Sequence, residues 1–420
     1  MSMKKWALMH LVLTCLPSAG SAAWTQVWGD EFNYQGLPDP AVWTYEEGYI
    51  RNWESQYYMK EDPDNTRVEN GALIIELHKQ AMGGMEYTSG SISTQNSRNW
   101  QYGRFEARMK LPVSKSMWPA FWLMPQSWAT GHSTWPASGE IDIMEGKGSN
   151  PSWTSGAIHF QNTDNNWQYR FNVFELMNGN FHDDWHVFAY EWTATEHRWY
   201  LDDQIFQRYT KADLATNPYP FDQPAHIKFD LALGGGFDGL PDSTTVTPMR
   251  FQVDYVRVYS GSQPTPSLTP PPYKHFSEGA ADLGNGSMSF WMKPNTGSKF
   301  VNIMVRKNGA VIGYPMALTS GRFEATLTGF NPGDFVEWEY VYTGIDVWGA
   351  PDMQVETGYL WYAAYTGKTG INHPPANAKG NPGTDGGIIF DMRGRRIRKG
   401  RNVHQPLIPR GRTAAGVPGR

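Results

Sequence analysis

The chain of 420 residues contains one cysteine, Cys15, close to the amino terminus. Residues 1–23 are typical of a secretory signal, with two lysines near the start, an apolar stretch over 6–16 and small residues before the expected cleavage point. We therefore expect a secreted protein whose mature chain has no disulfide. The alternative for Cys15 is lipid attachment, which the two residues before it fit poorly.

Charged side chains are scarce, at 18% of the chain, and no apolar run is long enough to cross a membrane. Basic side chains gather in residues 368–420, where eleven Lys or Arg accompany two Asp, so the remainder is acidic. An acidic body argues against nucleic acid as a partner. We expect 367–420 to be a basic, disordered tail, with adhesion to an acidic surface as the alternative.

No segment shows a convincing helical period, whereas aromatic residues reach 14% and glycine is abundant. Short runs of alternating apolar residues, such as 72–77, 103–110 and 253–259, are separated by Gly, Asn, Asp and Pro. This pattern predicts antiparallel strands and an all-β fold. The many tryptophans indicate either a large sandwich core or a cleft that stacks on sugar rings.

The composition divides the chain into two folded units. Residues 24–260 form one dense block of predicted strands, and the Pro-rich segment 261–272 reads as a stiff linker. Residues 273–366 again contain strand-like runs, and their length suits a second, smaller β-sandwich.

Three carboxylates lie close together in the run 139–146, Gly-Glu-Ile-Asp-Ile-Met-Glu-Gly. In a regular strand Glu140 and Asp142 share one face, and Glu145 points to the other. One extra residue, a β-bulge around Met144, would return Glu145 to the face of the other two. Like charges so placed disfavour joint ionisation, which suits acid–base chemistry better than a merely solvated strand.

Glycoside hydrolysis with retention needs two carboxyl groups about 5–5.5 Å apart, one nucleophilic and one that donates a proton. Glu140 and Glu145, brought to one face by the bulge, suit this arrangement. Asp142 between them would share a proton with Glu140 and tune both groups.

The segment 135–145, Trp-Pro-Ala-Ser-Gly-Glu-Ile-Asp-Ile-Met-Glu, resembles the active-site signature of glycoside hydrolase family 16 in its bulged, laminarinase-like form. Further similar motifs follow in family order at 28–33, 102–112, 117–123, 185–192, 221–224 and 253–259. The resemblance implies a concanavalin A-like β-jelly roll over 24–260 with an open cleft on its concave face. The extra residue between Asp142 and Glu145 separates this form from the unbulged relatives, which are strict mixed-linkage glucanases and xyloglucan-active enzymes.

The resemblance assigns the nucleophile to Glu140, the acid/base to Glu145 and the assisting carboxylate to Asp142. It also implies five substrate-side residues: Trp118, Trp135, His159, Asn52 and Arg104. Each of these five has an ordinary structural role as its alternative. The resemblance implies no cofactor for catalysis, and it suggests a structural calcium on the opposite face, held by Glu31, Gly71 and Asp254.

Two segments depart from the family pattern. Ser91 stands where laminarinases usually carry an arginine, and the run 230–237 opens with Asp and closes with Gly-Phe in place of Asn and Asn-Trp. Both changes fall in segments that bind sugar, so they bear on linkage preference.

The expected function is endo-hydrolysis of β-1,3 or mixed β-1,3/1,4-glucan by a secreted, monomeric enzyme whose partner is the β-glucan chain. Two alternatives stay open: a galactan-cleaving relative such as an agarase or carrageenase, and a glucan-recognition protein without activity. The second unit vaguely resembles small carbohydrate-binding sandwiches of β-1,3-glucanases, with Trp291, Trp348 and Trp361 as candidate stacking residues; a structural appendage is the alternative.

Overall fold

The computed structural model describes most of the two units that the sequence predicts. The described residues are 24–176, 178–214, 216–261, 276–294, 298, 300–308, 310–344, 353–356 and 361–364. The expected signal 1–23, nearly all of the linker 261–272 and the basic tail 367–420 lie outside them. Within the described ranges, no helix combines the length and the apolar character needed to cross a membrane.

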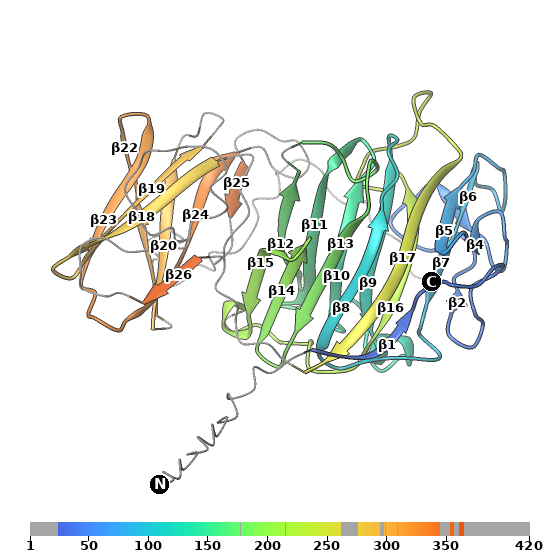
Figure 1. The fold of residues 1–420 in the computed structure, drawn as a ribbon, viewed down its shortest axis with the longest axis horizontal. Coiled ribbons are helices and arrows are strands. Elements are labelled where there is room, and N and C mark those ends of the chain that lie inside the picture. The colour runs from blue at the N-terminus through green and yellow to red at the C-terminus, as the bar shows by residue number, and fades with distance from the viewer. Residues whose placement is uncertain are drawn as a thin grey trace, which may run out of the picture.

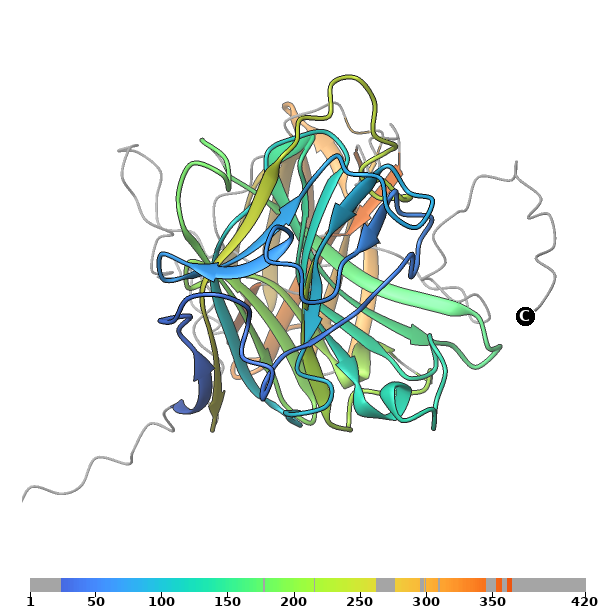
Figure 2. The same ribbon diagram turned by 90° about the vertical axis from the view of Figure 1, so that its right-hand side faces the viewer.

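The first unit is a sandwich of two antiparallel sheets (Figures 1 and 2). One sheet, here called the outer sheet, has the order β15-β14-β13-β8-β17-β5-β4, and β1 pairs with β17. Its strands are β15 (Gln204–Thr210), β14 (Glu196–Leu201), β13 (His186–Trp192), β8 (Gly103–Lys110), β17 (Met249–Ser260), β5 (Ala72–Leu77), β4 (Thr66–Glu69) and β1 (Thr25–Asp30).

The other sheet, here called the cleft sheet, has the order β12-β11-β10-β9-β16-β7-β2. Its strands are β12 (Trp167–Glu175), β11 (Asn150–Gln161), β10 (Glu140–Lys147), β9 (Met117–Pro125), β16 (Ala225–Leu233), β7 (Ser91–Ser93) and β2 (Thr44–Tyr45). A short parallel pair, β3 (Gln56–Tyr58) and β6 (Tyr87–Ser89), and two single turns, α1 (Gln126–Ala129) and η1 (Lys211–Leu214), complete the unit. The all-β jelly-roll fold that the sequence predicts is confirmed.

Strand alternation explains why the cleft sheet is apolar on one side and polar on the other. In β16, Ile227, Phe229 and Leu231 belong to the core between the sheets, whereas Lys228 and Asp230 alternate with them and point to the other face. Both polar side chains are nevertheless buried. The polar face of this sheet therefore contains enclosed charged groups, which must find partners on that face.

The second unit is a smaller sandwich with its own core. Its sheets have the orders β18-β19-β23-β22 and β21-β20-β24-β25, and β26 pairs with β24. The strands are β18 (Phe276–Gly284), β19 (Ser287–Pro294), β23 (Arg322–Thr328), β22 (Ala317–Thr319), β21 (Ala310–Pro315), β20 (Val301–Lys307), β24 (Phe335–Gly344), β25 (Met353–Glu356) and β26 (Trp361–Ala364). Phe290, Ile303 and Trp338 are fully buried between the sheets.

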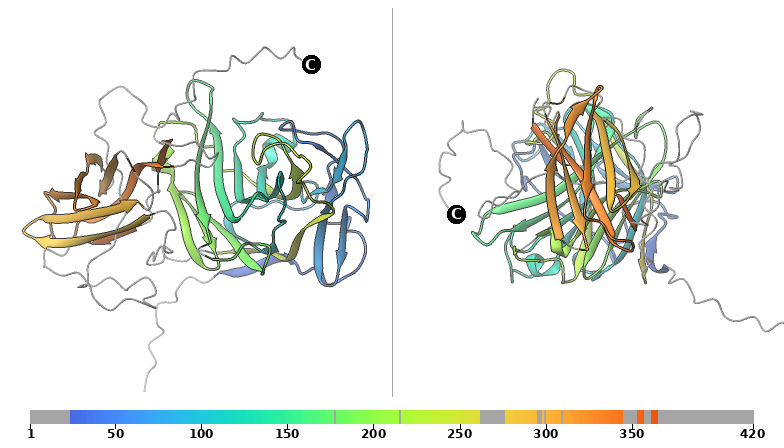
Figure 3. Two further views of the ribbon diagram at one scale, coloured as in Figure 1. Left: turned by 90° about the horizontal axis from the view of Figure 1, so that it is seen from above. Right: turned by 90° about the vertical axis from the view of Figure 1, so that its left-hand side faces the viewer.

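The two units meet beside the edge formed by β12 and β15 (Figures 1 and 3). Arg208 of β15 is paired with Glu337 of β24, and Arg306 of β20 is paired with Asp213 of η1. Arg306 Nη1 also lies 3.3 Å from a Glu337 oxygen. All four side chains are largely enclosed, so separating the units would expose charges that now neutralise one another.

Candidate active site

The β-bulge that the sequence predicts is present in β10. On the β11 side, Asp142 pairs with Ala157 and Glu145 with Ser155, so three steps along β10 match two along β11. On the β9 side the irregularity falls between Asp142 and Met144. One extra residue therefore lies between the second and third carboxylates.

The bulge places apolar and acidic side chains of β10 on opposite faces. Ile141, Ile143 and Met144 are all buried in the core between the sheets. Two consecutive core residues at 143 and 144 are what the extra residue permits. Glu140 and Glu145, which are partly accessible, are consequently turned to the face of the sheet opposite the core.

The neighbouring strands supply donors to the two ends of this carboxylate row. Trp118 Nε1 of β9 donates to Glu145 Oε1 at 3.0 Å, and the hydroxyl of Ser155 donates to the other oxygen at 3.4 Å. His159 of β11 pairs in register with Glu140, and its Nε2 lies 4.0 Å from Glu140 Oε1. The residues predicted to share one site are thus brought together.

Asp142 is the most enclosed of the three carboxylates. Its Oδ2 lies 3.0 Å from His159 Nε2, close enough for a strong charge interaction, but the direction of this contact is not that of a hydrogen bond. Glu140, Asp142 and His159 each also offer one atom that could bind a metal ion, and these three atoms lie within 4.8 Å of one another. We assign these groups to proton transfer because they continue the carboxylate row of β10.

Burial raises the pKa of each of these carboxyl groups. The pKa of Glu140 rises to about 7, first through burial and then through the charge of Asp142. The pKa of Asp142 rises to about 8, through burial and the charge of Asp230. The pKa of Glu145 rises to about 8, through burial and the charge of Asp142, although His159 and Trp118 oppose the rise. The row therefore keeps protons near neutral pH, as acid catalysis requires.

The raised pKa values predict a stability cost at alkaline pH. A carboxyl whose pKa is higher folded than unfolded holds a proton that the unfolded chain releases, so stability falls as pH rises from the unfolded pKa towards the folded one. Asp142→Asn should raise the melting temperature by about 5 °C at pH 8 and leave it unchanged at pH 4. Thermal unfolding at both pH values measures this effect. The exposed Asp164→Asn is the control, and equal shifts at both pH values would contradict the prediction.

Among the predicted substrate residues, the two tryptophans lie beside Glu145 and His159, and the asparagine lies with Trp118 around Gly235. Trp118 stacks on Phe237 with ring centroids 4.5 Å apart, while its Nε1 holds Glu145. Trp135 is 40% exposed and lies 6.3 Å from the His159 ring. Asn52 has a positive φ of 60° and donates to Glu54 Oε1 at 3.2 Å, so its amide is engaged within its own loop.

The prediction that Arg104 contacts the substrate is wrong. It lies on β8 of the outer sheet, where Phe105 faces the core, so the arginine points away from the cleft. Its guanidinium contacts Glu106, Glu191 and the ring of Tyr200. The alternating apolar residues after Arg104 already indicated this direction, and Arg104 is a structural residue of the convex face.

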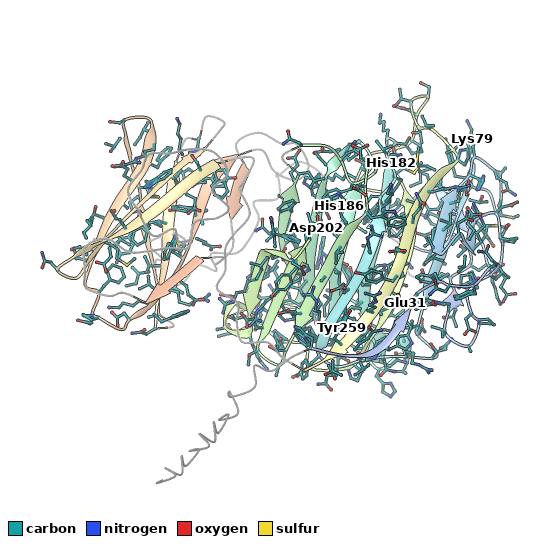
Figure 4. All side chains as sticks on the ribbon, in the orientation of Figure 1. Glu31, Lys79, His182, His186, Asp202 and Tyr259 are labelled. Carbon is teal, nitrogen blue, oxygen red and sulfur yellow. The ribbon has the colours of Figure 1, made fainter. Side chains whose placement is uncertain are left out.

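Two of the three predicted calcium ligands are engaged by arginine side chains. Both oxygens of Glu31, which lies near the end of β1 (Figure 4), accept from Arg257 at 2.8 Å, and Asp254 accepts from Arg108 at 2.8 Å. A calcium ion needs these oxygens for itself. The donor set as arranged does not fit the ion, and calcium there stays a prediction.

The two departures from the family pattern prove to be neighbours. Ser91 donates to Glu46 at 2.6 Å, and Glu46 also accepts from Lys228 at 2.7 Å. Asp230 accepts from Trp122 Nε1 at 2.7 Å, and Lys228 Nζ lies 4.4 Å from the Trp122 ring centroid. A lysine of β16 thus places a cation beside Ser91, the position where the family usually carries an arginine. Sequence reasoning missed Lys228 because its partners lie far apart in the chain.

Sequence reasoning also missed Trp167 of β12. This side chain is 50% exposed, and its Nε1 donates to His159 Nδ1 at 3.0 Å. Its ring stacks on His159 with centroids 5.6 Å apart and lies 5.4 Å from Trp135. The alternation of Trp167, Tyr169 and Phe171 along one strand face was the available signal.

Comparisons with known proteins agree with this geometry. The profile of glycosyl hydrolases family 16 matches residues 53–257. A β-glucanase of Rhodothermus marinus is 40% identical over 250 residues, which cover 56% of this chain and 85% of the relative. A glucan endo-1,3-beta-glucosidase of Cryptopygus antarcticus is 33% identical, over 57% of this chain and 93% of the relative. The solved laminarinase of Rhodothermus marinus has a TM-score of 0.53 at 38% identity, over 58% of this chain and 99% of that one.

Proposed function

Because the chain belongs to glycosyl hydrolase family 16, we propose that it is a retaining endo-β-glucanase acting on β-1,3 or mixed β-1,3/1,4-linked glucan. One observation carries the proposal: the bulge in β10 that turns Glu140 and Glu145 to the same face, with Asp142 between them. The similar proteins named a laminarinase and an endo-1,3-beta-glucosidase support the substrate class.

In the first half of the proposed reaction, a Glu140 oxygen attacks the anomeric carbon while Glu145 protonates the departing glycosidic oxygen. Trp118 holds the acid by donating to Oε1, and the transferred proton is assigned to Oε2, which the Ser155 hydroxyl contacts at 3.4 Å. The products of this half are a covalent glycosyl–enzyme ester and a departing chain with a new hydroxyl at its non-reducing end.

In the second half, the Glu145 carboxylate removes a proton from water, which attacks the anomeric carbon, breaks its bond to Glu140 and so frees the new reducing end. Asp142 and His159 lie beside Glu140 and adjust its charge as it bonds to and leaves the sugar. Two inversions at one carbon retain the β configuration.

One panel of polysaccharide substrates distinguishes the proposed glucanase from its two alternatives. A galactan-cleaving enzyme would release reducing ends from agarose, and a recognition protein would bind glucan without releasing any. We expect release from laminarin and lichenan, with the β-anomer appearing first by proton NMR. Release from agarose alone would move the enzyme to the galactan class, and no release from any polysaccharide would reject the enzymatic proposal.

We further propose that the enzyme is secreted and acts as a monomer, on the basis of the signal-like residues 1–23 and the acidic body. The structural calcium is also a proposal, which requires displacing Arg257 from Glu31 and Arg108 from Asp254. If calcium binds there, adding it after chelation raises the melting temperature of the wild type and not of Asp254→Asn. An unchanged melting temperature in the wild type would reject the site.

We propose that the second unit binds glucan and raises the local enzyme concentration on insoluble chains. Of its candidate stacking residues, Trp291 is half-buried, with the Arg322 guanidinium 4.9 Å from its ring centroid. Trp348 lies outside the described residues, as does the side chain of Trp361 in β26.

Removing residues 261–420 should therefore reduce hydrolysis of insoluble glucan several-fold more than hydrolysis of soluble oligomers. Truncation also uncovers Arg208 and Asp213, so Trp291→Ala in the full chain is the matched variant. Reducing-end assays on both substrate forms measure the ratio. Equal losses on soluble and insoluble substrate would contradict binding by this unit.

A further inference from the structure

Trp167 contacts His159 on the side away from the carboxylates. Its indole N–H donates to His159 Nδ1 at 3.0 Å, while His159 Nε2 lies 3.0 Å from Asp142 Oδ2. Gln161 pairs with Trp167 and His159 with Tyr169, so Trp167 lies two residues along β12 from the partner of His159, on the same face of the sheet. The two nitrogens of one ring therefore have different and well-defined neighbours.

These contacts fix where the imidazole carries its proton. An indole N–H can only donate, so the nitrogen that accepts from it must hold a lone pair. Nδ1 is then unprotonated, and the neutral ring carries its hydrogen on Nε2, facing Asp142 and Glu140. Adding a second proton at Nδ1 requires breaking the bond from Trp167.

We propose that Trp167 is a positioning residue of the acid–base machinery, which holds His159 in the neutral tautomer that carries its hydrogen on Nε2, the nitrogen beside the carboxylate row. The proposal deepens the glucanase function and rests on it. Trp167 is half exposed and lies against Trp135, so the same indole that sets the histidine also borders the sugar-binding cleft.

The charged groups around His159 explain why the position of its ring proton matters. The groups facing it are Glu140, Asp142 and Glu145 from β10 and Tyr169 from β12, and the more distant Arg51 and Lys228 act on Glu140. A second proton on the imidazole would place a positive charge beside these carboxyl groups. Such a charge would in turn draw the proton from Glu145, which the first half-reaction needs protonated. By occupying Nδ1, Trp167 opposes that outcome.

Trp167→Phe tests the inference because it keeps an aromatic ring at this position and removes the indole N–H together with the five-membered ring that carries it. The alkaline limb of kcat/KM on laminarin should move to lower pH by about 0.5–1 unit, the value of one hydrogen bond. We expect kcat to fall at pH 8 with little change in KM. Trp135→Phe is the matched control: it should raise KM and leave the pH profile in place.

A second measurement does not depend on activity. Nitrogen-15 NMR of labelled histidine should show His159 Nδ1 as an unprotonated acceptor in the wild type and in Trp135→Phe, and as partly protonated in Trp167→Phe. An unchanged Nδ1 signal together with an unmoved alkaline limb in Trp167→Phe would overturn the inference. If none of the polysaccharides is cleaved but Nδ1 still responds, the proposed function fails while the control of the tautomer stands.

Discussion

Glu140→Gln is expected to lower kcat on laminarin by on the order of 10⁴- to 10⁶-fold, the loss typical of removing a covalent nucleophile. The amide has nearly the shape of the carboxylate but cannot form the ester. Binding should be retained, because the stacking residues Trp118 and Trp135 are untouched. Rates of reducing-end release and the dissociation constant for a soluble oligomer measure the two effects separately.

A nucleophile has a stereochemical signature that a merely structural residue lacks. With Glu140→Ala, azide can enter the vacated space and attack the anomeric carbon of an activated β-glucosyl donor from the same side as Glu140. The product should be the α-glucosyl azide. Restoration of rate without that product, or activity of Glu140→Gln near that of the wild type, would remove Glu140 from the nucleophile position.

Glu145→Gln is expected to lower kcat/KM on polysaccharide by about 10²- to 10⁴-fold, the usual contribution of a positioned general acid. Substrates with a good leaving group need little protonation, so an activated aryl glycoside should form the glycosyl–enzyme at nearly the wild-type rate. The raised pKa of Glu145, about 8, places proton loss from this group on the alkaline limb of the wild-type profile. The contribution of Glu145 to that limb should disappear in the variant, and any limb that remains belongs to Asp142.

Azide again provides the control. In Glu145→Gln the ester to Glu140 still forms, and azide attacks it from the opposite side, so the product should be the β-glucosyl azide. Opposite azide anomers from the two variants would establish the two roles independently. Equal loss on polysaccharide and on the activated glycoside would falsify the proton-donor role.

The sequence was most informative where one short strand determines the geometry. The three residues from Asp142 to Glu145 require an extra residue if both glutamates are to share a face, and β10 has that bulge. The reason is local: side chains alternate along a strand, so spacing alone decides the face. The same rule, applied to Phe105, would have shown that Arg104 points away from the cleft.

The partners of the acid–base groups could not be read from spacing. His159 receives the N–H of Trp167 across the pairing of β11 with β12, and Lys228 finds Glu46 from a segment 182 residues earlier. Such contacts depend on which strands become neighbours and at what register. In the second unit, the position of Trp291 beneath Arg322 likewise follows from strand packing.

By itself, the sequence determined the all-β class, the division into two units and the row of carboxylates on β10, because strand periodicity, a Pro-rich segment and a bulge are properties of contiguous residues. Only the tertiary structure decided which protons those carboxylates keep. Burial within the cleft sheet raises their pKa values, and the tautomer of His159 is set by a tryptophan from another strand. Solvent exclusion and cross-strand contact arise when distant segments pack together.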